Sequence, residues 1–264
     1  MLVDELPIAS FQAPAAQPAR AAACASTCAS ASGSTSFGQP GQGGQADDSK
    51  LFNIRVALSA GCHEDSGALV RRMYAWRGYA FEAGRREAAD KVTLYAETGG
   101  ELVGTMSLWL DKCNALPADE NFRDRLDLLR AEGRRLVEPS RLAIDAGTSK
   151  RVFAALIHIS YLYACELHGF TDYVIEVNPR HVAFYRRMLG FADFGGERPC
   201  GRVGAPAVLL RLPLDEMGAR IRRWGGSGEQ QGGERSFYPY FFPPSEEAGI
   251  SARLAALCRG GECA

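Results

Sequence analysis

The sequence predicts an α/β (α+β) protein with a mixed, twisted sheet and helices on both of its faces. Residues 92–98 and 101–110 have the composition of two strands around Gly99-Gly100, which is a hairpin signal. Residues 174–178 form a short strand with apolar residues on both sides, typical of a buried parallel strand. A helix at 149–167 lies between this strand and an earlier one at 136–145, so the two should form a right-handed parallel crossover.

The other elements follow from periodicity and from helix end signals. Alternating apolar residues predict a first strand at 51–58, and apolar spacings of three and four predict an amphipathic helix at 63–77. Pro179 at the first helical position and Gly190 after the last one bound a further helix. The remaining predicted elements are helix 118–132, strands 191–194 and 207–212, helix 214–224 and helix 245–257.

Composition divides the chain into four parts. Residues 1–49 are rich in Ala, Ser, Gly, Gln and Pro and have few large apolar groups, so we expect them to be disordered. Residues 50–224 contain the periodic segments and should form the folded domain. A glycine-rich stretch at 225–236 should be a flexible linker, and the aromatic residues of 237–264 should dock on the domain.

Charge and cysteine usage exclude several function classes. A net charge of −1 gives no electrostatic reason to expect nucleic acid binding. The chain begins with acidic residues and has no apolar run approaching about 18 residues, which predicts a cytoplasmic protein without a secretory signal or membrane span. The eight cysteines form no convincing metal site. Neither the Cys24/Cys28 pair nor the Cys258/Cys263 pair has the two-residue spacing of a zinc site or a neighbouring histidine, so we expect free thiols and no bound metal.

The strand at 136–145 carries the strongest chemical candidates. Pro139 is disfavoured inside a central strand and therefore predicts a bulge there. Such a bulge would let Glu138 and Arg141 face the same cleft, Glu138 as a general base and Arg141 as a bidentate clamp for a substrate carboxylate. The alternative is a structural Glu–Arg ion pair at an irregular strand.

The helix that begins at Pro179 offers a second set. His181, Tyr185 and Met188 fall on one helical face, and an inward tyrosine there could protonate a leaving group. Asn178 and His181 are candidate substrate-binding residues, with His181 near the leaving atom. The alternatives are that Asn178 is only the helix cap and that His181 is only a residue of the first turn. A tyrosine that only packs in the core is the alternative for Tyr185.

The run from Val174 to Phe191 resembles the last motif of the GCN5-related N-acyltransferase (GNAT) fold, in which central parallel strands splay apart. Glu138-x-Ser-Arg followed by Leu-Ala-Ile-Asp145 is similar to the signature strand of acyl-homoserine-lactone synthases. Together with Leu116-Pro-Ala-Asp119 and the segment around Arg130, it looks like the long-chain N-acyl amino acid synthases of the FeeM type.

This resemblance implies an acyltransferase that takes its acyl group from acyl carrier protein. It implies active-site roles for Glu138, Ser140, Arg141 and Tyr185, and it places Arg72 loosely among the substrate-binding residues. The implied partners are acyl carrier protein and an amino acid, without nucleic acid, and any membrane contact would be that of the lipid product. No cofactor is expected beyond the acyl-phosphopantetheine of the carrier, which is a co-substrate.

The loop before helix 149–167 bears on the choice of acyl donor. Ordinary GNAT enzymes hold the coenzyme A pyrophosphate with a loop of several glycines, whereas this loop has Gly147 alone. A helix start with basic residues still suits a single phosphate, so a carrier-bound phosphopantetheine is the expected ligand. The residues proposed to bind it are Thr148, Ser149, Lys150 and Arg151.

Two other functions remain open on the sequence. One is an acyl-homoserine-lactone synthase that uses S-adenosylmethionine. The absence of the arginine that those enzymes carry in the third strand favours the amino acid synthases. The other is a non-catalytic module that binds a carrier protein.

Overall fold

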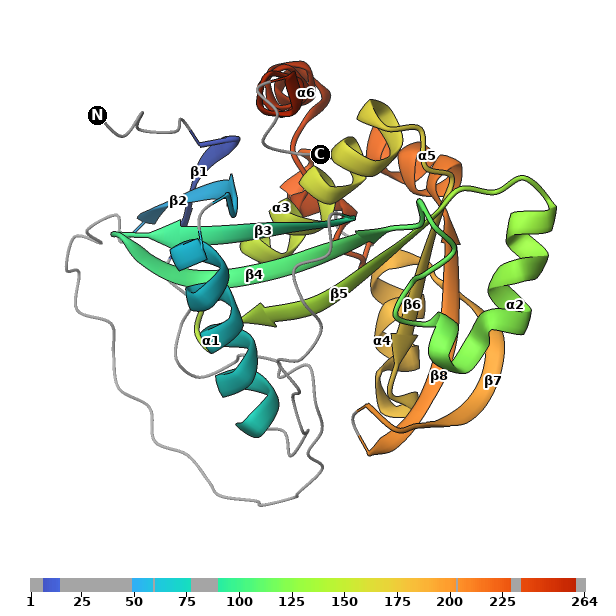
Figure 1. Cartoon of the computed structure of the whole chain (residues 1–264). Helices are drawn as coiled ribbons and strands as arrows, with labels where there is room; N and C mark the ends of the chain where they lie inside the picture. The colour runs from blue at the N-terminus through green and yellow to red at the C-terminus, as the bar shows by residue number, and fades with distance from the viewer. Residues whose placement is uncertain are drawn as a thin grey trace, which may run out of the picture.

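The protein is built on one eight-stranded mixed sheet in the order β1-β2-β3-β4-β5-β6-β8-β7. The computed structural model describes residues 7–14, 49–58, 60–76, 90–202, 204–228 and 234–259. Helices cover both faces of the sheet, as predicted, with α1 and α2 on one face and α3 and α4 on the other (Figure 1). The strands are β1 (Ala9–Pro14), β2 (Ser49–Val56), β3 (Lys91–Thr98), β4 (Glu101–Leu110), β5 (Leu136–Ile144), β6 (Asp172–Val177), β7 (Ala192–Cys200) and β8 (Ala205–Pro213).

The helices match the apolar periodicity closely, with shifted ends. They are α1 (Ala60–Trp76), α2 (Asp119–Ala131), α3 (Lys150–Tyr161), α4 (Pro179–Leu189), α5 (Leu214–Trp224) and α6 (Pro244–Arg259). The predicted long helix at 149–167 changes at its end, because α3 continues as the π-helix η1 (Leu162–Leu167). None of the helices in the described part of the chain is long and apolar enough to span a membrane.

The splayed strands of the sheet are β5 and β6, which are parallel as predicted. Both strands are described in full, and they pair through Leu136–Asp172 and Val137–Tyr173 at their beginnings. Beyond these pairs, β5 continues along β4 and β6 continues along β8. The middle of the sheet therefore opens after Val137, and the next residue on β5 is Glu138.

Two faces of the sheet bury separate apolar clusters. Leu136 and Val174 belong to the cluster under α2, which includes Trp109 and Phe122. Val137 belongs to the larger cluster on the opposite face, where α3, α4 and α5 pack. By the alternation of side chains along a strand, Glu138 shares the α2 face with Leu136.

The expectation that residues 1–49 are disordered is wrong for residues 9–14. These residues form the edge strand β1, antiparallel to β2, and Phe11 stacks on Phe52 with ring centroids 5.7 Å apart. Burial alternates along β1, with Ala9, Phe11 and Ala13 inside, and Ile8 just before the strand is buried as well. Ala9 and Ala13 fill two of the three inward positions of β1, so Phe11 alone supplies the large apolar side chain by which strands are usually recognised. Residues 15–48 of the expected tail lie outside the described part of the chain.

The aromatic segment after residue 236 forms part of the main core. Tyr238, Phe241 and Phe242 are each no more than 2% exposed. Tyr238 begins the short 3-10 turn η3 (Tyr238–Tyr240), and Phe241 and Phe242 lie between this turn and α6. The Phe242 N–H donates to Nδ1 of the buried His158 on α3 at 3.0 Å, so a backbone hydrogen bond and ring burial together attach this segment.

One hairpin is longer than the sequence indicated. Strand β7 runs to Cys200, six residues beyond the predicted end at Phe194. Its pairing with β8 shifts register on both sides of Gly195, where the ring of Phe122 lies so close that a Cβ would be 2.9 Å from it. Gly195-Gly196 and Pro199 have low strand propensity, so the sequence indicates a shorter strand. Pairing with β8 nevertheless holds these residues in an extended strand.

Candidate active site

Glu138 is a buried carboxylate at the point where β5 and β6 separate. It is 3% exposed, and its Oε2 accepts a hydrogen bond from the Ala118 N–H at 2.8 Å. Desolvation raises the pKa of Glu138 from 4.5 to about 8, although the Ala118 hydrogen bond and the charge of Arg202 act in the opposite direction. A carboxyl group with a pKa near 8 ionises as the pH rises through about 8, and in that ionised form it can accept a proton from an ammonium group.

A second acidic side chain lies on the same face across the opening of the sheet. Glu176 on β6 accepts from Asn121 Nδ2 at 2.6 Å and pairs with Arg202, which follows the end of β7. The Nε of Arg202 is 3.2 Å from Glu120 on α2, without the geometry of a hydrogen bond. Arg202 thus connects the hairpin, β6 and α2 beside Glu138.

Sequence reasoning did not single out Glu176 or Arg202. The sequence signal for Glu176 is its position inside an otherwise apolar, buried strand, because a buried charge there needs a charged or hydrogen-bonding partner. Arg202 had no such signal, because a turn arginine is ordinarily solvated and its partners are distant in sequence.

The predicted bulge in β5 is confirmed, but it begins after Ser140. Pro139 pairs in regular register with Leu108, whereas Arg141 and Leu142 together lie opposite Met106 on β4. Arg141 has a φ of +51°, in the left-handed region that residues other than glycine rarely adopt. The extra residue places Arg141 on the face of Glu138, as the sequence predicted.

Ser140 and Arg141 both contact the indole of Trp109. The Trp109 Nε1–H donates to Ser140 Oγ at 3.0 Å, and the Arg141 guanidinium carbon is 5.9 Å from the ring centroid. Burial lowers the pKa of Arg141 below its usual value. Glu138 is the direct cross-strand neighbour of Trp109, so Glu138, Ser140 and Arg141 form one contiguous set on this face.

A small pocket lies between α1 and the sheet, next to Arg141. Its volume is about 30 Å³, enough for one or two water molecules. Four hydroxyl side chains, two cationic side chains and one histidine line it together with Gly67 and Val70. They are Ser66, Thr93, Thr105, Ser107, Lys91, Arg141 and His63.

Tyr185 lies on the opposite face of the sheet from Glu138. It is half-buried on α4, its ring meets Phe191 edge-on at 5.9 Å, and it packs against the main core. The sequence had suggested one slot flanked by both side chains. The structure instead places them on the two faces of the sheet at its splayed strands, so that any group acting on both must lie between β5 and β6.

The helix start at α4 has the predicted local structure. The Asn178 side chain accepts from the Arg180 N–H at 3.2 Å, which makes it the N-cap, and Gly190 ends the helix with a φ of +86°. His181 Nε2 accepts from Arg180 Nε at 3.3 Å, within the first turn.

The loop before α3 meets both ends of the chain. Ser149 is the N-cap of α3 and accepts from the Arg151 N–H at 3.3 Å, and the Thr148 N–H donates to Asp145 at 3.1 Å. The Lys150 ammonium lies 4.2 Å from the ring centroid of Tyr240. Arg151 donates to the Gln12 carbonyl at 3.1 Å and covers the ring of Phe11.

Comparison with known proteins identifies the family. A family profile described as N-acyl amino acid synthase FeeM matches residues 65–213, more than half of the 264 residues. The chain belongs to this FeeM family. The structure of FeeM, an N-acyl amino acid synthase from uncultured soil microbes, is similar with a TM-score of 0.59 and 27% identity, over 64% of this chain and 94% of that one.

Other solved structures are similar at lower identity. The AHL synthase LasI matches with a TM-score of 0.41 and 15% identity, over 62% of this chain and 90% of its own. An acyl-CoA N-acyltransferase from Pseudomonas aeruginosa matches with a TM-score of 0.44 and 15% identity, over 61% and 98%. No curated protein matches the chain. This FeeM-family protein is an acyltransferase with the GNAT fold, and its membership supports N-acyltransferase activity.

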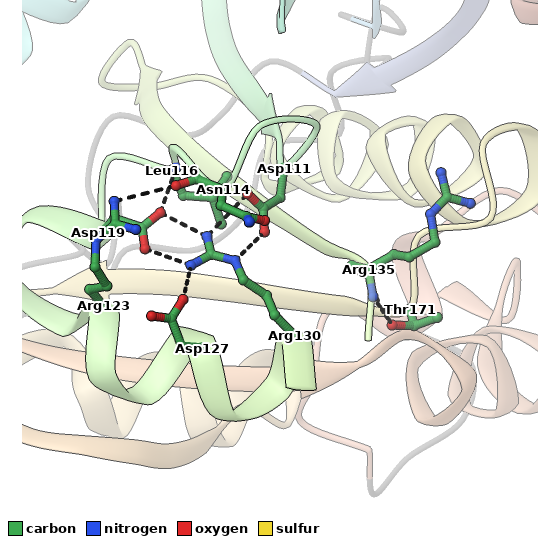
Figure 2. A network of polar contacts seen from close by, with 9 residues as sticks. All are labelled: Asp111, Asn114, Leu116, Asp119, Arg123, Asp127, Arg130, Arg135 and Thr171. Atoms are coloured by element: carbon green, nitrogen blue, oxygen red, sulfur yellow. Dashed lines mark hydrogen bonds and ion pairs between the residues drawn. The ribbon is translucent and has the colours of Figure 1, made fainter. Parts of the chain in front are cut away.

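A buried ion cluster holds the loop that reaches Glu138 in this FeeM-family protein. Arg130 on α2 directs all five of its N–H groups at three carboxylates, those of Asp111, Asp119 and Asp127 (Figure 2). Asp119 Oδ2 also accepts from the Leu116 N–H at 2.7 Å. The cluster therefore fixes residues 111–119, and with them the Ala118 N–H that Glu138 accepts.

Arg72, the other predicted substrate-binding residue, is engaged in an ion pair. Its Nη2 lies 2.5 Å from Asp145, just beyond β5, and the Arg72 side chain is 63% exposed. It does not line the pocket beneath α1. In the described part of the chain, no group of three or more His, Cys, Asp or Glu side chains is placed to hold a metal ion.

Proposed function

We propose that this protein transfers a long-chain fatty acyl group from acyl carrier protein to the α-amine of an amino acid and so makes an N-acyl amino acid. The observation that carries the proposal is the buried Glu138 with a raised pKa beside the opening between β5 and β6. Membership of a family of N-acyl amino acid synthases supports the same reaction. No bound cofactor is required, since the acyl-phosphopantetheine enters as a co-substrate.

In the proposed reaction the thioester lies between the two splayed strands. Glu138 takes the proton of the incoming ammonium, directly or through a water, and the free amine attacks the thioester carbonyl. Backbone N–H groups of β5 stabilise the oxyanion. The C–S bond then breaks, and Tyr185 gives its proton to the departing thiolate on the other face of the sheet. The second proton of the attacking nitrogen leaves to solvent, from which the Tyr185 phenolate is reprotonated.

The opposed positions of Glu138 and Tyr185 require the reacting carbonyl to lie in the opening between β5 and β6, where it faces both sides of the sheet. In the tetrahedral intermediate the amine nitrogen and the thioester sulfur are both bonded to the former carbonyl carbon, and they point away from it in different directions. A base and an acid that serve them do not need to touch each other. Each needs to reach its own atom from its own side of the opening.

The choice of carrier protein as donor is supported by the loop before α3. It has one glycine, Gly147, and its helix start could hold the single phosphodiester of phosphopantetheine with Thr148 and Ser149. Lys150 and Arg151 would first exchange their aromatic partners for the phosphate. An exposed cation–π contact is worth only about 0.5–1 kcal/mol, so a charge-assisted phosphate contact would outweigh it.

The deciding experiment offers the purified protein one acyl chain on two donors. Acyl carrier protein and coenzyme A, loaded with the same long-chain acyl group, are each incubated with a mixture of amino acids, and the products are weighed by mass spectrometry. An N-acyl amino acid formed faster from the carrier is expected. If neither acyl thioester is consumed in the presence of any amino acid, N-acylation is contradicted. Release of methylthioadenosine from S-adenosylmethionine would indicate lactone synthesis instead.

A further inference from the structure

The pocket beneath α1 contains a buried hydroxyl group without a partner. Four hydroxyl side chains line it, each no more than 4% exposed. Thr93 and Ser107 hydrogen-bond each other at 2.9 Å, and Thr105 donates to the Leu94 carbonyl at 3.1 Å. The Ser66 Oγ has no hydrogen-bond partner in the described part of the chain.

An unpartnered buried hydroxyl is costly and therefore needs a reason. Leaving such a group unsatisfied costs free energy on the scale of a lost hydrogen bond, so native proteins pair nearly all of them. The face of a helix that packs on a sheet is usually apolar, yet this one presents Ser66 and Gly67 to the polar side chains of β3 and β4. The arrangement fits a site that is completed when a ligand binds.

The charge of the lining defines the class of that ligand. Lys91 and Arg141 line the pocket, and no Asp or Glu is among its described lining residues. Both cations also flank the ring of Trp109, each 5.9 Å from its centroid. A small space with two cations and a hydroxyl donor suits a carboxylate.

We propose that this pocket binds the carboxylate of the acceptor amino acid, with Ser66 and Lys91 completing the site that begins with Arg141. The inference rests on the proposed function. Glu138 and Arg141 lie on the same face of β5, three residues and about 10 Å apart along the strand. The Arg141 side chain and a bound α-amino acid together span the distance from Arg141 to Glu138. With its carboxylate held at Arg141, the amino acid therefore has its amine directed toward Glu138.

Replacing Ser66 by alanine tests the proposal, with Ser160→Ala as the matched control. Ser160 is also fully buried, but its hydroxyl is paired with Tyr173 at 2.7 Å and with Ile157, on the opposite face of the sheet. Ser66→Ala is expected to raise the KM for the amino acid about tenfold, the size expected for one lost hydrogen bond to a charged group, without lowering the melting temperature. Ser160→Ala should lower the melting temperature and leave KM unchanged.

Two further comparisons separate this inference from the proposed function. The carboxamide of the accepted amino acid should react at least tenfold less efficiently than the acid with the wild-type protein, and Lys91→Met should reduce that preference. The inference is overturned if the carboxamide reacts as well as the acid or if Ser66→Ala leaves KM unchanged. In either case the proposed N-acylation still holds as long as the wild-type protein forms the N-acyl product.

A binding measurement without donor covers the case in which nothing is acylated. The amino acid alone should raise the melting temperature of the wild-type protein more than that of Ser66→Ala. A Ser66-dependent shift produced by a free fatty acid and not by the amino acid would assign the pocket to the acyl substrate and overturn the inference.

Discussion

Replacing Arg130 by methionine is expected to lower the free energy of unfolding by about 3–5 kcal/mol, because it leaves two buried carboxylates without their cation. Arg130 is 11% exposed, and the Asp111 and Asp119 side chains are 3% and 4% exposed. Methionine has a similar length and apolar stem, so the change removes the charge and the hydrogen bonds with little loss of packing volume.

The structure supplies the magnitude. Arg130 makes two hydrogen bonds to Asp111, at 2.7 and 3.0 Å, and two to Asp119, both at 2.7 Å. Neither carboxylate can reach water to replace them. The third partner, Asp127, is 53% exposed, so its contact at 2.8 Å contributes little, as for other exposed pairs.

Urea denaturation followed by circular dichroism measures the effect, and Asp127→Asn is the control within the same cluster. The control should change the free energy of unfolding by less than about 0.5 kcal/mol. Arg130→Met should also lower the melting temperature by about 10 °C at this chain length. A loss below about 1 kcal/mol in Arg130→Met would refute the reasoning, since it would mean that Asp111 and Asp119 find other partners or water.

Three further predictions concern the two proposed catalytic groups. The kcat/KM of the wild-type protein should rise with pH through about 8 as Glu138 ionises. Glu138→Gln should lose this rise with pH and most of the activity. If the midpoint of the rise instead follows the pKa of the acceptor amine across a series of amino acids, Glu138 is excluded as its source. Glu138 binds a proton more tightly in the folded protein than in the unfolded chain, so wild-type stability should fall by several kcal/mol as pH rises from about 4.5 to about 8, and chemical denaturation of Glu138→Gln should show a smaller fall. Tyr185→Phe should lower kcat about a hundredfold while the melting temperature stays the same, and an unchanged kcat would remove its role as an acid.

The local features of the site were readable from the sequence because their causes lie within a few residues. Asn178, Pro179 and Gly190 bound α4 through a cap, a fixed φ and a left-handed residue, and each acts on its immediate neighbours. Pro139 predicted an irregular β5 for a similar reason. The exact position of the bulge, at Arg141 opposite Met106, depended on β4 and lay beyond what β5 alone could indicate.

Contacts between distant segments could not be predicted in this way. Arg151 was expected to be available to a phosphate, yet it covers Phe11 of a strand 140 positions earlier in the chain, a strand that composition had assigned to disorder. Arg202 reaches Glu176 from a turn, and only the fold of the β7–β8 hairpin brings it there. The lone hydroxyl of Ser66 likewise became visible only once α1 was packed on β3 and β4.

The sequence by itself determined the class of sheet, its helices, the family and the residues on β5 and α4 that carry the candidate chemistry. Periodicity, end signals and short motifs encode these features locally. The tertiary structure decided on which face each group lies, that Glu138 is buried enough to hold its proton near neutral pH, and that Tyr185 stands across the sheet from it. Burial and facing depend on which segments meet, and that is settled by packing over the whole chain.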